Sequence, residues 1–195
     1  MNSIPALFAC IEAQEHRFQN FLARLTAQES FSLDRESVSL AAELTAAFAK
    51  ELGFSVEEHP FPRAGSGLVV SRETGSVSAP IGFVAHLDTV HPAGSFPDSL
   101  KPAPEGGLYG PGIVDCKGGV AVALLAMYAL KELGFSRPLR LLLTPDEEVS
   151  NRLTGDDGIA FLQSHVKDCA AAFVCECGKR DEAVVERKGI TKVRV

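Results

Sequence analysis

The sequence predicts an α/β protein, a three-layer sandwich in which helices cover both faces of a mixed, largely parallel sheet. Helical and strand patterns alternate along the chain, an order that is typical of this class. Two expected strands, at residues 81–87 and 138–144, are continuous apolar runs. Such runs indicate strands that are buried on both faces, as in parallel sheets.

Two helices are expected before the first strand. Ser3 and Pro5 are typical of a helix start, and the helix that follows is expected to present one apolar side. The second helix is capped by Asp34 or Ser37 and ends at Gly53. The apolar positions are Leu7, Ile11, Phe18, Phe21, Leu22 and Leu25 in the first helix, and Val38, Ala41, Leu44, Phe48 and Leu52 in the second.

The later elements continue the alternation. Residues 88–107 are rich in Pro, Gly and Ser, and are expected to form a long surface loop. A helix at residues 117–133 is apolar on nearly every side, which predicts that it is well buried. The other expected elements are strands at 54–58 and 68–72 with a turn at 63–67, a helix at 156–166, a strand at 170–175, and a hairpin of 183–187 and 190–195 around Lys188 and Gly189.

Length and charge exclude some classes of function. The 195 residues fit one domain with a sizeable core, or a piece of something larger. The formal net charge is −6 and the chain has no stripe rich in Lys or Arg, so a nucleic-acid partner is not expected. No apolar run is long enough to span a bilayer, so a membrane partner is not expected either.

The amino terminus and the cysteines favour a cytoplasmic location. The first residues lack the basic region of a signal peptide and are interrupted by Glu12 and Glu15. The five cysteines are an odd number without regular spacing, which suggests reduced thiols. Cys175 and Cys177 have the spacing of half a zinc knuckle, but no matching second pair exists, so we interpret them as small buried apolar residues.

Metal-binding side chains follow the apolar runs. The residues concerned are His86, Glu147, Glu148 and Glu176, each after a predicted buried strand, and Asp115, which begins the helix between two strands. Ligands of open α/β sheets bind at the carboxyl ends of the strands. Imidazole nitrogen and carboxylate oxygen are the donors of a catalytic zinc site. The sequence therefore predicts a metal site at this edge of the sheet.

Each motif by itself also fits a simpler interpretation. A strand-end His is more often a hydrogen-bonded structural residue, and a pair of glutamates is usually a solvated charge pair. Gly110 and Gly112 resemble the start of a dinucleotide fingerprint, but the third position is Asp115, whose charge would repel a pyrophosphate. No nucleophile elbow, P-loop or His-Glu-x-x-His is present. The prediction of a metal site therefore depends on the combination of these motifs rather than on any one of them.

The motifs together resemble one known family over nearly the whole chain. They are His86-Leu-Asp88-Thr-Val, Leu108-Tyr-Gly-Pro-Gly-x-x-Asp115-x-Lys-Gly-Gly, Asp146-Glu147-Glu148, Glu176, and the closing Arg187-Lys-Gly-Ile. This set is similar to that of the co-catalytic zinc exopeptidases and amidohydrolases. The family includes glutamate carboxypeptidase, aminoacylase, acetylornithine deacetylase and succinyl-diaminopimelate desuccinylase.

The resemblance implies a di-zinc hydrolase of peptide or N-acyl amide bonds in small substrates. It implies the following roles: His86 and Glu176 on the first zinc, Glu148 on the second, Asp115 bridging both, Glu147 as the general base, and Asp88 orienting His86. Bridged metals about 3.5–4 Å apart and a carboxylate behind a His ligand are familiar features of such sites. The donor set suits Zn²⁺ and would accept Co²⁺ or Mn²⁺.

The family pattern also includes features beyond these ligands. It implies a cis peptide between Asp115 and Cys116, where Cys116 replaces the more usual Met and is expected to be a packed thiol rather than a ligand. It further requires a fifth ligand, a His, and a lid domain that provides dimer contacts. The remaining histidines, His16, His59, His91 and His165, match neither position.

Residues 1–195 are therefore expected to be the N-terminal part of the catalytic domain, with no lid and little activity alone. Two alternatives stay open. One is a non-catalytic metal-binding domain, although such a domain has no need of Glu147. The other is a plain α/β domain whose strand-end acids are solvated.

Overall fold

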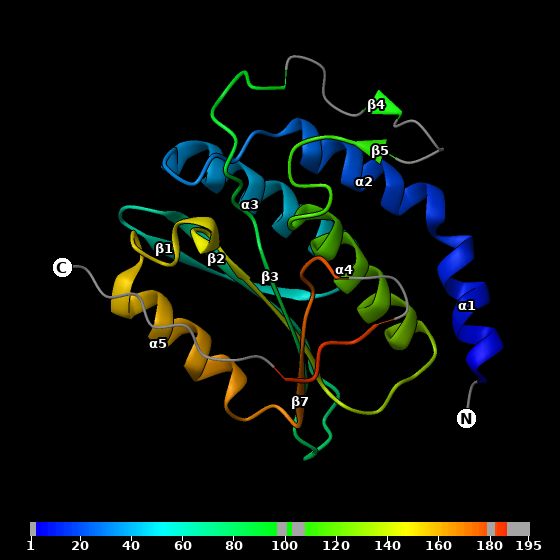
Figure 1. Cartoon of the computed structure of the whole chain (residues 1–195). Helices are drawn as coiled ribbons and strands as arrows, with labels where there is room; N and C mark the ends of the chain where they lie inside the picture. The colour runs from blue at the N-terminus through cyan, green and yellow to red at the C-terminus, as the bar shows by residue number, and fades with distance from the viewer. Residues whose placement is uncertain (1–2, 97–100, 103–107, 179–181, 187–195) are drawn as a thin grey trace.

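The computed structural model describes residues 3–96, 101–102, 108–178 and 182–186. At its centre is a five-stranded sheet with the strand order β1–β2–β6–β3–β7 (Figure 1). The strands are β1 (Ser55–Phe61), β2 (Gly65–Arg72), β3 (Ile81–His86), β6 (Leu139–Thr144) and β7 (Ala171–Val174). Strands β6, β3 and β7 are parallel, whereas β1 and β2 form an antiparallel hairpin that joins β6 through β2. The predicted α/β class with a mixed sheet is confirmed.

Helices cover both faces of the sheet, so the structure has three layers (Figure 1). On one face lie α2 (Glu15–Ala27), α3 (Arg35–Glu51) and α4 (Lys117–Glu132), which share a large apolar core with the sheet. On the other face lies α5 (Gly155–Val166), which packs on a smaller apolar cluster.

The alternating side chains of the central strands explain their continuous apolar runs. In β3, Phe83 and Ala85 belong to the larger core, while Val84 packs against the cluster under α5. In β6, Leu141 belongs to the larger core and Leu142 to the smaller cluster. Successive strand residues point to opposite faces, so a strand covered on both sides must be apolar throughout.

The first predicted helix is in fact two helices. Helix α1 (Ile4–Ala13) ends at Gln14, and α2 begins at the next residue. In α2, Phe18 and Phe21 are buried against Phe48 of α3, with ring centroids 5.2 and 4.1 Å from that ring. Helix α1 has no buried residue and lies at the edge, against α4. The chain therefore turns where packing on α3 begins, and no Gly or Pro marks that point.

The ends of the next helices agree with the prediction. Asp34 is the N-cap of α3, because its Oδ1 accepts hydrogen bonds from the backbone of Glu36 at 3.1 Å and Ser37 at 3.3 Å. Helix α3 is followed by Gly53 with a φ of 82°, a conformation that favours glycine. Helix α4 is largely buried, as predicted. The exceptions are Val122, which is 63% exposed, and Glu132 at the end of the helix.

Three other expectations need correction. The surface loop after β3 includes a short antiparallel pair, β4 (Lys101–Pro102) with β5 (Leu108–Tyr109). Residues 183–186 form no strand, and the rest of the predicted hairpin lies outside the described residues. Cys177 is exposed, contrary to the expectation, whereas Cys175 is half-buried and packs against the larger core.

No helix in the described part of the chain is both long and apolar enough to cross a membrane. All five cysteines are free thiols.

Candidate metal centre

The structure brings the six predicted site residues together at the carboxyl edge of the parallel strands. His86 ends β3, and Asp88 lies two residues further on. Glu147 and Glu148 begin the 3₁₀ turn η2 (Glu147–Val149) after β6. Glu176 follows β7, and Asp115 precedes α4. Each acid lies where a strand ends or a helix begins, so the common edge follows from the parallel arrangement of the strands.

The imidazole of His86 faces carboxylates with both of its ring nitrogens. Its Nε2 lies 2.8 Å from Oδ1 of Asp115 and 3.6 Å from Oε1 of Glu176. Its Nδ1 faces Asp88, 3.0 Å from the backbone oxygen and 3.2 Å from Oδ1. Burial alone would lower the pKa of His86, but hydrogen bonds to Asp88 and Glu176 outweigh it and raise the pKa to about 12.

Asp88 connects His86 to the two glutamates. The buried carboxylate accepts a hydrogen bond from the backbone N–H of Glu147 at 3.1 Å and from that of Glu148 at 3.2 Å. The hydroxyl of Ser32 donates to the same carboxylate at 2.6 Å. Asp88 therefore contacts both the imidazole of His86 and the backbone of the glutamate pair.

A second buried carboxylate, Asp146, holds the loop that follows the glutamates. It accepts hydrogen bonds from the backbone N–H groups of Leu153 and Thr154 and from the hydroxyl of Thr154, all at 2.9 Å. The side chain of Asp146 is completely buried. The start and the end of this loop are thus fixed by separate carboxylates.

The carboxylates at the site repel one another. Burial, together with the nearby charge of Asp115, raises the pKa of Glu148 to about 7. Burial also raises the pKa of Glu147. Crowded carboxylates with one imidazole among them are stabilised by a divalent cation, which supplies the missing positive charge.

Among the described residues, two groups of side chains could hold a metal ion. Ligand atoms of His86, Asp115 and Glu148 lie within 4.8 Å of one another, as do those of His86, Cys116 and Glu176. Imidazole and carboxylate donors match zinc and the related divalent metals. The donor chemistry of this edge therefore fits the predicted ion.

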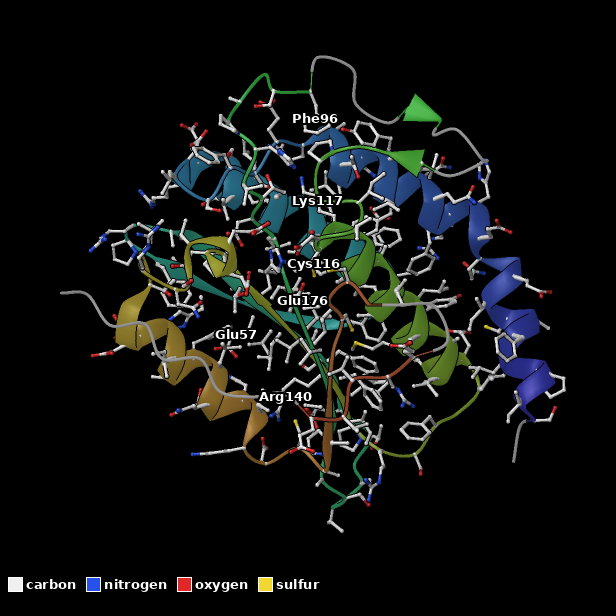
Figure 2. The ribbon with its side chains drawn as sticks, in the orientation of Figure 1. Glu57, Phe96, Cys116, Lys117, Arg140 and Glu176 are labelled. Atoms are coloured by element: carbon white, nitrogen blue, oxygen red, sulfur yellow. The ribbon has the colours of Figure 1, made fainter. Side chains whose placement is uncertain are left out.

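Cys116 has the backbone conformation that the resemblance implied, and its thiol faces the interior. The Asp115–Cys116 peptide bond is cis, as the resemblance implied. The thiol is buried and donates a hydrogen bond to the backbone oxygen of Cys175 at 3.4 Å. Burial raises the pKa of Cys116 to about 12. Cys116, Lys117 and Glu176 lie close together in Figure 2, where α4 begins beside the end of β7.

Two residues beside the site have roles that the motifs did not reveal. Ser32 contacts Asp88 from the segment between α2 and α3. Lys117 belongs to the Lys-Gly-Gly motif, but the burial of its side chain was not predicted. The side chain is fully buried, and Nζ donates to the backbone oxygen of Gln28 at 2.7 Å. Burial lowers the pKa of Lys117 to about 8. No local pattern in the sequence singles out Ser32.

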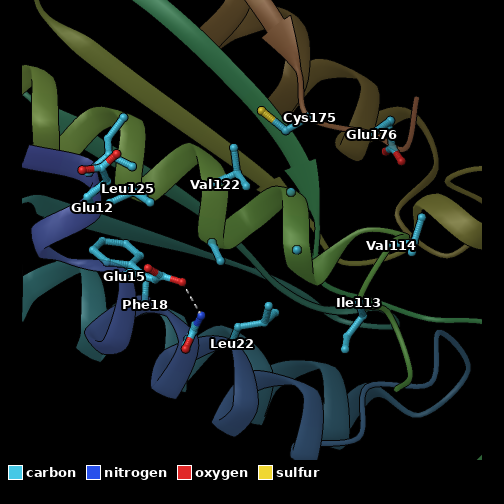
Figure 3. Close-up of a pocket in the computed structure, with 15 residues that line it drawn as sticks. Glu12, Glu15, Phe18, Leu22, Ile113, Val114, Val122, Leu125, Cys175 and Glu176 are labelled. Carbon is cyan, nitrogen blue, oxygen red and sulfur yellow. Dashed lines mark hydrogen bonds between the residues drawn. The ribbon is translucent and has the colours of Figure 1, made fainter. Parts of the chain in front are cut away.

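Several hollows in the described part of the chain are lined by predicted site residues. A hollow of about 190 Å³ is lined by Asp115, Glu148 and His91 among others, next to the metal-binding atoms. His91 itself packs against Phe96, as expected of a loop residue. A groove of about 580 Å³ between α2 and α4 is mostly apolar, and Glu176 is the one predicted site residue that lines it (Figure 3). The smaller hollow is the one that lies beside the predicted ligands Asp115 and Glu148.

An α/β sheet that gathers an imidazole and several carboxylates at its strand ends defines a metallohydrolase class. Residues 82–193 match the model of "Peptidase family M20/M25/M40". The chain belongs to this family, and the predicted resemblance is confirmed.

Individual relatives are distant. The chain is 32% identical over 126 residues to acetylornithine deacetylase of Salmonella arizonae, a match that covers 61% of this chain and 32% of that protein. Human carnosine dipeptidase 1 has a similar fold, with a TM-score of 0.74 and 18% identity over 88% of this chain and 41% of that one. The dipeptidase Dug1p of Saccharomyces cerevisiae gives a TM-score of 0.73 and 17% identity over 88% and 40%. The chain thus spans about a third to two fifths of the proteins that it matches.

Proposed function

We propose that this chain provides the metal-binding and proton-transfer residues of a zinc-dependent hydrolase that cleaves peptide or N-acyl amide bonds in small substrates. The observation that supports this most directly is the orientation of His86. Its Nδ1 faces Asp88, while Nε2 faces Asp115 and Glu176. An imidazole held in this way presents one nitrogen to a metal among carboxylates.

The proposed ligands divide between two ions. His86 and Glu176 would hold the first, Glu148 the second, and Asp115 both. When bound, zinc supplies a Lewis acid for the scissile carbonyl and lowers the pKa of water. The Co²⁺ and Mn²⁺ ions fit the same donors.

Glu147 is the proposed general base. Its backbone N–H is held by Asp88, and it is next in sequence to the proposed ligand Glu148. In this role the carboxylate accepts a proton from the attacking water and returns it to the leaving amine nitrogen. Asp88 keeps His86 and Glu147 in a fixed relation, because the same Oδ1 contacts both.

The substrate class is proposed from the names of the relatives, a deacetylase and two dipeptidases. Both activities hydrolyse an amide bond in a small molecule, of carboxypeptidase or deacylase type. We propose a cytoplasmic location from the reduced cysteines. A second candidate is metal binding without turnover, for which the clustered ligand atoms of His86, Asp115 and Glu148 would suffice.

The test is metal content combined with hydrolysis. After mild chelation, the wild-type chain should retain about one zinc ion per chain, measured by mass spectrometry. His86→Ala should lose it, whereas His16→Ala, at an exposed position on α2, should not. Wild type that retains no zinc, cobalt or manganese would contradict the metal centre.

Turnover then separates the two candidates. Hydrolysis of N-acyl amino acids or dipeptides that is lost in Glu147→Gln, with metal retained, would support the enzyme. If the wild-type chain retains metal but neither it nor any variant hydrolyses these substrates, metal binding alone would be favoured.

A further inference from the structure

We infer that Ser32 is a positioning residue of the metal centre, because its hydroxyl fixes the Asp88 carboxylate that joins His86 to the glutamate pair. This inference rests on the proposed function and extends it to a residue outside the motifs named above. Ser32 lies 56 residues before Asp88 in the chain, and both side chains are buried.

The hydroxyl proton of Ser32 points to Asp88. Its Oγ lies 2.6 Å from Oδ2 of Asp88 and 3.1 Å from the backbone oxygen of Thr89. A serine hydroxyl has one proton to donate. A hydrogen bond to a charged acceptor is shorter and stronger than one to a neutral carbonyl, so the 2.6 Å contact is the one that receives the proton.

This bond completes the hydrogen bonding of the carboxylate. Oδ1 of Asp88 contacts Nδ1 of His86 at 3.2 Å and accepts from the backbone of Glu147 at 3.1 Å. Oδ2 accepts from the backbone of Glu148 at 3.2 Å and from Ser32 at 2.6 Å. A carboxylate has about two acceptor positions on each oxygen. Three of them receive hydrogen bonds here, and the fourth faces His86, whose Nδ1 lies 3.0 Å from the backbone oxygen of Asp88.

The four contacts fix how the carboxylate is turned. The bond from Ser32 is the shortest of them, and it holds Oδ2 away from His86 while Oδ1 faces the ring. Without it, Oδ2 would have only the longer bond from Glu148. Rotation of the carboxylate would then move its contacts with His86 and Glu147 together, so a metal ligand and the proposed base would both lose their alignment.

The backbone holds Ser32 in place without the hydroxyl. The N–H of Thr89 donates to the oxygen of Ser30 at 2.8 Å, and the N–H of Ser32 donates to the oxygen of Thr89 at 3.0 Å. Phe31 and Thr89 form a parallel bridge between the same segments. Removal of the hydroxyl should therefore change the orientation of the carboxylate and leave the segment where it is.

Ser30 offers a matched control. Like Ser32, it is buried, lies on the same segment and donates to the segment after β3, but its acceptor is the backbone oxygen of Leu87, at 2.7 Å. Replacement of either serine by alanine removes one buried hydroxyl and one hydrogen bond. Only Ser32 reaches the carboxylate behind the metal ligand.

The experiment compares zinc affinity, by competition with a chromophoric chelator, and melting temperature without metal. Ser32→Ala should weaken zinc binding by about 10-fold or more, the usual effect of losing a partner behind a metal ligand. Both variants should lower the melting temperature by similar amounts, because each loses one buried hydrogen bond. Ser30→Ala should nevertheless leave zinc affinity within about twofold of wild type. Ser32→Thr, which keeps the hydroxyl, should retain most of the affinity.

The outcomes separate the positioning role from the proposed function. If wild type binds zinc and His86→Ala does not, while Ser32→Ala binds as wild type does, the role of Ser32 is wrong and the metal centre stands. Equal losses of affinity in Ser30→Ala and Ser32→Ala, or a Ser32→Ala protein that no longer melts cooperatively, would indicate a purely structural role and overturn the inference. Wild type that binds no zinc overturns the proposed function together with it.

Discussion

A side chain at Gly119 would overlap the backbone oxygen of Cys175, because the first turn of α4 lies directly against the end of β7. Gly118 has the same relation to the backbone oxygen of Ile113. The two glycines thus let the helix start pack between the loop that ends in Asp115 and the strand end that precedes Glu176. Their place in the Lys-Gly-Gly motif is explained by backbone packing at the metal centre.

Gly119→Ala should therefore weaken metal binding as well as the fold. The added methyl can be accommodated only if α4 or the segment at Cys175 moves, which changes the spacing of Asp115 and Glu176. We expect a lower melting temperature and a loss of zinc after chelation. Gly178→Ala is the control, since nothing lies within 4 Å of a methyl at that position. Gly119→Ala with unchanged melting and zinc content would contradict this account.

Asp146→Ala should destabilise the loop between β6 and α5. The substitution leaves the backbone N–H groups of half-buried Leu153 and buried Thr154 without their carboxylate acceptor. Unsatisfied buried donors cost about 1–3 kcal/mol, so the free energy of unfolding in urea should fall by at least that order. Asp156→Ala, at an exposed position in the first turn of α5, should cost less than about 1 kcal/mol. Equal losses in both variants would show that burial of Asp146 has no special role.

The strand-end positions could be predicted because they depend on local patterns. Apolar runs specify the buried strands, and parallel strands place their carboxyl ends at one edge, which is why His86, Glu147 and Glu176 meet. The role of Asp88 behind His86 also follows from short spacing along one loop. These relationships require only that the strands form and pair.

The contacts that were missed depend on tertiary packing. Ser32 reaches Asp88 through the bridge between Phe31 and Thr89, and no local pattern specifies that pairing. The break after α1 likewise occurs where α2 begins to pack on Phe48. Buried Lys117 was missed because charged side chains are normally expected on the surface.

The separation of α1 from α2 predicts unequal effects of two phenylalanine substitutions. Phe21 of α2 is 1% exposed and stacks on Phe48, with an angle of 8° between the rings, whereas Phe8 of α1 is 57% exposed. Phe21→Ala should lower the free energy of unfolding by about 3–5 kcal/mol, the usual cost of removing a buried phenylalanine. Phe8→Ala should change it by less than about 1 kcal/mol. Similar losses for both, measured by urea unfolding, would support the single helix expected from the sequence pattern.

The ion pair between Arg140 and Asp168 predicts a small dependence of stability on pH. Nη1 of Arg140 lies 2.8 Å from Oδ1 of Asp168 and also donates to the backbone oxygen of His165 at 2.6 Å. The hydrogen bond from Arg140 lowers the pKa of Asp168 below its ordinary value of 3.8. Because the folded pKa is the lower one, the unfolded chain binds more protons in this range, and stability rises with pH.

The stabilisation should be complete above pH 3.8 and should disappear as the pH falls through the folded pKa. Asp168 is 53% exposed, so solvent screening limits its contribution to less than about 1 kcal/mol. Asp168→Asn should therefore be slightly less stable than wild type in urea at neutral pH, with a smaller difference in 1 M salt and none at the acid end of the range. A difference that is independent of both pH and salt would mean that Asp168 acts through packing rather than through its charge.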